Sequence, residues 1–80
     1  MNTEYHVIIA DDSDHEKVFA EIQRDGKFLA MVSQEDGPER LVVELPGLGL
    51  DESQVARQVP LSDFVAVLER AAKKLIGEGK

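Results

Sequence analysis

The chain of 80 residues contains no cysteine, few basic residues and no long hydrophobic run. Without cysteine, neither a disulfide nor a thiolate metal site can stabilise the fold, and thiol chemistry is excluded. No segment approaches the roughly 20 apolar residues that a membrane-spanning helix needs. Residues 1–14 also lack the basic start and the apolar centre of a signal peptide. We therefore expect a cytoplasmic protein.

Acidic residues outnumber basic ones by 16 to 9, which gives a net charge of −7. Residues 1–54 hold 13 acids and 4 bases (4 − 13 = −9), whereas residues 55–80 hold 3 acids and 5 bases (5 − 3 = +2). Such a field repels nucleic acid and anionic membranes and attracts basic partners. The alternative is that the charge serves solubility alone.

Hydrophobic periodicity predicts an α+β fold in one domain that spans residues 1–80. The expected architecture is an antiparallel meander sheet of four or five strands with one C-terminal helix packed on one face. Strands are expected at residues 4–10, 17–24, 27–34 and 40–45, and a short fifth strand at 55–59 is left open. The helix is expected at 61–76, where apolar residues recur at the i, i+3, i+4 and i+7 spacing of one buried stripe.

The strand register decides which residues are free for function. Asp25-Gly26 between two alternating runs predicts a two-residue type I′ turn. With that turn, Ile22 opposes Leu29 and Ala20 opposes Met31. The predicted core face is then Val18–Ser33–Leu41, Ala20–Met31–Val43 and Ile22–Leu29–Leu45. The opposite face is Phe19–Val32–Val42, Glu21–Ala30–Glu44 and Gln23–Phe28.

This second face carries an apolar band where a solvated sheet face should be mostly polar. A contiguous exposed apolar area usually marks an interface, so the face is the predicted partner-binding surface. Its residues are Phe19, Glu21, Phe28, Val32, Val42 and Glu44. Other interpretations of this face stay open. The 46–54 segment or the helix covers it, or the face remains a mildly apolar solvated surface.

Residues 11–16 (DDSDHE) form a polar turn that precedes the second strand. A calcium loop of the helix-loop-helix kind needs a glycine at its sixth position, where this turn has Glu16, and its flanks here are strands. The prediction is a solvated acidic turn that presents Asp11, Asp12, Asp14 and Glu16 to a basic partner, with a cation site as the weaker alternative. No metal site is predicted.

No catalytic grouping emerges from the spacing of His6, His15 and the many carboxylates. Gly47-Leu48-Gly49 lacks the third glycine and the setting of a dinucleotide-binding loop, and there is no phosphate-binding loop. We therefore expect neither an enzyme nor a cofactor.

The run 59–71 (VPLSDFVAVLERA) follows the predicted sheet and opens the helix. In this order of elements the chain resembles small acidic bacterial immunity proteins of polymorphic toxin systems. The resemblance implies a protein that binds and neutralises a toxin, often a basic nuclease, by occlusion, with carboxylates in place of substrate phosphates. The expected function is a non-catalytic, acidic protein-binding module. The alternative is a self-associating accessory domain whose Phe19 face forms a homodimer.

Overall fold

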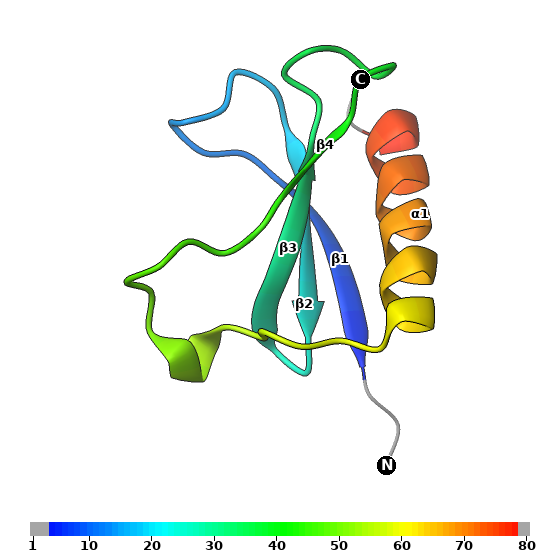
Figure 1. Ribbon diagram of the computed structural model, residues 1–80. Coiled ribbons are helices and arrows are strands. Elements are labelled where there is room, and N and C mark those ends of the chain that lie inside the picture. Colours follow the sequence, from blue (N-terminus) through cyan, green and yellow to red (C-terminus); the bar gives the residue numbers. More distant parts are fainter. Residues whose placement is uncertain (1–3, 79–80) are drawn as a thin grey trace.

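The computed structural model describes residues 4–78, which form a four-stranded antiparallel sheet and one long helix (Figure 1). The sheet order is β1-β2-β3-β4, and helix α1 packs against one face of it. The predicted fold class is therefore confirmed. The elements are β1 (Tyr5–Ala10), β2 (Phe19–Arg24), β3 (Lys27–Ser33), β4 (Val42–Glu44), the 3-10 turn η1 (Glu52–Gln54) and α1 (Leu61–Glu78).

The β2–β3 turn has the conformation that its sequence predicts. Asp25 and Gly26 have φ angles of 52° and 82°, and a type I′ turn requires positive φ at both central positions. Aspartate tolerates this region better than most residues, and glycine adopts it without steric cost. Next to the turn the predicted pairs are also present, because Arg24 opposes Lys27 and Gln23 opposes Phe28.

One step further along, a β-bulge shifts the register. Ile22 opposes Ala30, and Ala20 opposes Val32, so Leu29 is an extra residue on β3. The predicted pairs Ile22–Leu29 and Ala20–Met31 are therefore wrong by one residue. Leu29 and Ala30 are both buried in the same core. The bulge thus adds one more apolar side chain to the core than strict alternation would allow.

The shift carries over to β4. Val32 opposes Val43, and Met31 opposes Glu44, which is again one residue from the predicted register. Because directly paired residues point to the same side of a sheet, Val32 faces α1 instead of the opposite face. Met31 takes its place there, in a row with Glu21 and Glu44.

The core lies between α1 and the sheet. Its centre consists of strand residues and of three helix residues spaced four apart, which form the buried stripe of α1. These residues are Val7, Ala20, Ile22, Leu29, Ala30, Val32, Val67, Ala71 and Leu75. The helix thus covers the face that β1, β2 and β3 present to it, and the opposite face needs another cover.

The fifth strand, left open from the sequence, is reduced to one residue. Val55 forms an isolated parallel bridge with Phe28, and the Ala56 N–H donates to the Phe28 carbonyl oxygen at 2.8 Å. This contact continues the edge of β3 where β4 has already ended, since β4 pairs only with Met31–Ser33.

Candidate functional site

The loop of residues 11–18, which joins β1 to β2, folds over the sheet face that α1 leaves open. In Figure 1 this loop and α1 lie on opposite sides of the strands. The His15 imidazole contacts the Phe19 ring, with ring centroids 4.8 Å apart and planes tilted by 45°. Phe19 is only 4% exposed as a result of this packing. The cover of this face is therefore the acidic turn itself.

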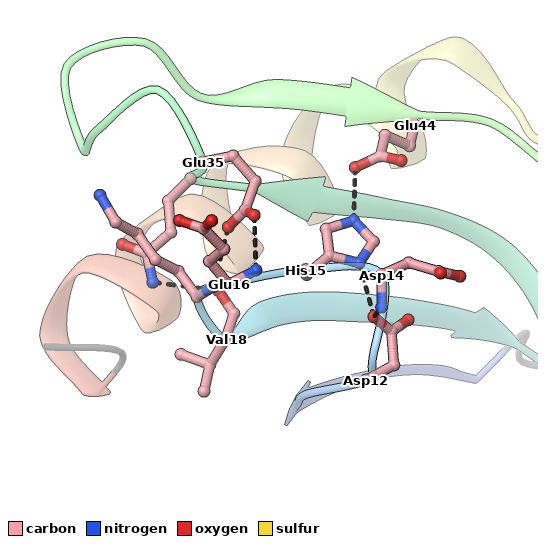
Figure 2. A network of polar contacts seen from close by, with 9 residues as sticks. Asp12, Asp14, His15, Glu16, Val18, Glu35 and Glu44 are labelled. Atoms are coloured by element: carbon pink, nitrogen blue, oxygen red, sulfur yellow. Dashed lines mark hydrogen bonds and ion pairs between the residues drawn. The ribbon is translucent and has the colours of Figure 1, made fainter.

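His15 is held in place by two carboxylates from different parts of the chain (Figure 2). Its Nδ1 lies 2.8 Å from an Asp12 oxygen, and its Nε2 lies 2.9 Å from a Glu44 oxygen. The hydrogen bonds to Asp12 and then Glu44 raise the pKa of His15 from 6.5 to about 9, against a smaller opposing effect of desolvation. At neutral pH the ring is positively charged, and each ring N–H donates a hydrogen bond to one carboxylate.

The same contacts favour the ionised form of both carboxyl groups. The hydrogen bond from His15 is the largest cause that lowers the pKa of Asp12 below its usual value. The hydrogen bond from His15 Nε2 is likewise the largest cause that lowers the pKa of Glu44, and the hydrogen bond from the Ser33 hydroxyl lowers it further. The His15 side chain is 11% exposed, so this pairing is shielded better than an ordinary surface ion pair.

A second set of hydrogen bonds, from the Glu35 and Gln34 side chains, holds the end of the loop that leads into β2. The Glu35 carboxylate accepts hydrogen bonds from the backbone N–H groups of Glu16 and Lys17 at 2.6 and 2.8 Å (Figure 2). The Gln34 side-chain amide donates to the Val18 carbonyl oxygen at 3.0 Å. Glu35 was not singled out from the sequence. The observed β2–β3 register, extended past both strands, would have placed it opposite Lys17.

The predicted partner-binding residues are divided between two faces. Phe19 is buried under His15, and Val32 is buried on the α1 side, so their predicted exposure is wrong. Phe28 is half-buried beside the Val55 bridge, while Val42 is exposed. The predicted apolar band is therefore not a continuous exposed surface. Nor does the 46–54 segment cover Phe19, since Leu48 is 98% exposed.

The predicted acidic residues stay on the outer surface of this face. Asp11, Asp12, Asp14 and Glu16 are exposed, and an oxygen of Asp12 also accepts the backbone N–H of Asp14 at 2.9 Å. Glu21 is half-buried and accepts a hydrogen bond from the Gln23 side chain. We call the set Asp11, Asp12, Asp14, Glu16, Glu21 and Glu44 the acidic face. Within residues 4–78, no group of three or more such side chains is arranged to hold a metal ion.

The polar contacts of this face serve its own architecture. Both His15 nitrogens are engaged, so the ring has no free position at which to accept a proton from a substrate. His6 lies apart and exposed, with Nε2 3.5 Å from Glu4. What the arrangement offers is an ordered array of carboxylates, which can steer and bind positive charge.

The 46–57 segment is fastened at the other end of the sheet. Arg57 forms two hydrogen bonds to the Glu52 carboxylate, at 2.9 and 2.6 Å, and donates to the carbonyl oxygens of Pro46 and Gly47 at 3.0 Å each. Arg57 also lines a shallow hollow of about 360 Å³ together with Arg24 and Lys27. Its guanidinium is already paired, so this hollow is basic only in part.

Comparison of the chain with protein-family models, with curated proteins and with solved structures finds no match. None of the helices described is both long and apolar enough to cross a membrane.

Proposed function

We propose that this protein is a non-catalytic binding module that takes a basic protein partner on its acidic face. The observation that carries the proposal is the set of hydrogen bonds that holds the acidic loop. His15 and Glu35 bind residues 11–17 over the sheet, with the exposed carboxylates pointing outward. An ordered array loses less conformational entropy on binding than a flexible acidic tail. The apolar anchor predicted at Phe19 has no part in it.

The partner class follows from charge. Residues 1–54 carry a net −9, and the acidic face lies within them. A partner with a cationic surface is attracted, while nucleic acid and anionic membranes are repelled. The resemblance of residues 59–71 to immunity proteins names a basic toxin as one such partner, and a cytoplasmic location belongs to the same proposal. An inhibitor would lower the activity of its bound enzyme, whereas a plain binding module would leave it unchanged.

The test compares two charge reversals of equal size. Glu16→Lys alters the acidic face, and Glu4→Lys alters an exposed glutamate that lies outside it, before β1. With a lysine-rich peptide as probe, stopped-flow measurements should show a slower association rate for Glu16→Lys and little change for Glu4→Lys. Added salt should slow association of the unmodified protein more than it changes dissociation. Equal losses in both variants, or no binding of the peptide, would contradict the proposal.

A homodimer through the Phe19 face was the alternative prediction. Phe19 is 4% exposed and packed against His15, so it offers no area to a second copy. Large exposed apolar side chains occur instead on helix α1, for example Leu61 and Val65.

A further inference from the structure

Helix α1 covers only part of its sheet face. It contacts β1, β2 and β3, and within the described chain it makes no contact with β4. One flank of the helix is fastened to β1: Arg70 donates to the Tyr5 carbonyl oxygen at 3.0 Å, and the Tyr5 hydroxyl donates to Asp63 at 2.8 Å. The other flank therefore points toward the β4 side, as the separation of α1 and β4 in Figure 1 also indicates.

That free flank is apolar. Leu61, Val65 and Ile76 are exposed, and at 100° per residue they lie on the side of the helix opposite Arg70. Leu61 is 77% exposed, which is unusual for a large apolar side chain on a helix that has a polar side available. From the sheet, Val43 points to the same side because it pairs with buried Val32. Exposed Leu45 follows it.

Between these two rows the surface is hollowed. A cavity of about 260 Å³ lies beside Leu29 of the bulge and Phe64 of α1; the segments after β4 and before α1 complete its lining with Leu45, Pro46, Ala56, Arg57 and Val59. Leu61 and Val65 are helical neighbours of Phe64 but do not themselves line the cavity. The surface thus combines a ridge with a hollow. We call the set Val43, Leu45, Leu61, Val65 and Ile76 the apolar strip.

We propose that the apolar strip is the interface of a twofold homodimer, in which a second copy of this chain covers the β4 side of this sheet face, which α1 does not contact and which Ala56 and Val59 cover only in part. Strands lie about 4.8 Å apart and packed helices about 8–10 Å apart, so a four-stranded sheet has room for roughly two helices on one face. The second helix comes from the other copy. A twofold interface must be self-complementary, and a surface with both a ridge and a hollow meets that condition.

Charge also favours a second copy at this place. Each chain carries −7, so two copies can approach closely only where the acids are few. Helix α1 holds three bases and three acids (3 − 3 = 0), and the five residues of the apolar strip are all uncharged. The 11–18 loop, which carries most of the acidic face, lies on the opposite side of the strands (Figure 1). Glu69 and Lys73 are exposed beside the strip. In an antiparallel pair of α1 helices that cross level with residue 71, Glu69 of one copy lies near Lys73 of the other.

The first test uses two adjacent residues of β4. Val43 and Val42 are 42% and 44% exposed and point to opposite faces of the same strand. The molar mass in solution, measured by sedimentation over a range of concentrations, should be twice 8.8 kDa for the unmodified protein and for Val42→Asp. Val43→Asp should raise the dimer dissociation constant roughly tenfold or more, since it places an unpaired carboxylate in the interface. Circular dichroism establishes that both variants are folded.

A charge exchange gives a second test that leaves the apolar residues intact. Glu69→Lys alone should weaken the dimer, and the addition of Lys73→Glu should restore it, because the two charges have then changed places. A monomer of 8.8 kDa at every concentration would overturn the proposal, as would a dimer that Val42→Asp dissociates as readily as Val43→Asp. Neither result depends on the peptide measurements that test the acidic face.

Discussion

The imidazole of His15 lies against the ring of Phe19, with the two centroids 4.8 Å apart. This contact joins a residue of the acidic loop to the buried ring of Phe19, on the sheet face that α1 does not cover. His15 is able to fill that place because Asp12 and Glu44 balance its charge from both sides. The loop therefore has two sides: the His15 ring faces inward against Phe19, and exposed carboxylates face outward.

Removal of the His15 ring should loosen the loop. His15→Ala should speed amide hydrogen exchange across residues 11–18 and lower the midpoint of urea unfolding, because Phe19 loses its cover and two carboxylates lose their cation. The matched control is His6→Ala, an exposed histidine on β1. It should change the free energy of unfolding by no more than about 0.5 kcal/mol. Equal effects of the two substitutions would mean that His15 does not cover the face.

Phe19 should behave as a core residue. Phe19→Ala should lower the free energy of unfolding by about 3 kcal/mol, which is typical of a buried phenylalanine. Val42→Ala, at an exposed position on the same face, should cost less than about 1 kcal/mol. Urea unfolding followed by circular dichroism measures both. Phe19→Asp should unfold the protein instead of releasing folded monomers, and a stable, folded Phe19→Asp protein would contradict this assignment.

Stability should depend on pH in a defined window. The pKa of His15 is raised to about 9 in the folded state, so its contribution is complete below 6.5 and is lost as the pH rises through about 9. The pKa values of Asp12 and Glu44 are lowered, so their contributions are present above 3.8 and 4.5 and are lost as the pH falls. Unfolding free energy should be highest between about 4.5 and 6.5.

The matching control is His15→Gln, which keeps a polar side chain of similar size without the titrating group. Its unfolding free energy should be nearly flat between pH 6.5 and 9, where that of the unmodified protein declines. If both proteins declined in parallel over this range, another group would be responsible for the pH dependence.

The meander and the helix could be predicted because their signals are local. Asp25-Gly26 specifies its turn, and the apolar spacing of residues 61–76 specifies the buried stripe of α1. The register could not be predicted, because a bulge is chosen by packing. Leu29 and Ala30 both enter the core beneath the helix, and nothing in the order Phe28-Leu29-Ala30-Met31 marks the extra residue.

That correction to the register is itself testable. Val32→Ala should lower the free energy of unfolding by roughly 2 kcal/mol, since it removes two buried carbon atoms. Met31→Ala, on the half-exposed neighbour, should cost less than half as much. The predicted register, with Met31 in the core, requires the opposite order. Chemical denaturation of the two variants therefore decides between the two registers.

The acidic turn was predicted as a solvated element, and its carboxylates are exposed. That this turn covers Phe19 could not be predicted from the sequence, because its position depends on hydrogen-bond partners remote in the chain. His15 finds Glu44 29 residues away, and the N–H groups of Glu16 and Lys17 find Glu35 19 and 18 residues away. Only a correct β2–β3–β4 register places those carboxylates beside the loop.

Closure of the sheet face by the 11–18 loop is tested most directly by one NOESY spectrum of the unmodified protein at neutral pH. The contact predicts strong cross-peaks between the ring protons of His15 and those of Phe19, since the centroids lie 4.8 Å apart. An absence of these cross-peaks, together with broadening of the Phe19 ring signals by a soluble paramagnetic agent, would contradict it. Phe19 would then be exposed, and its face would again be open to a partner.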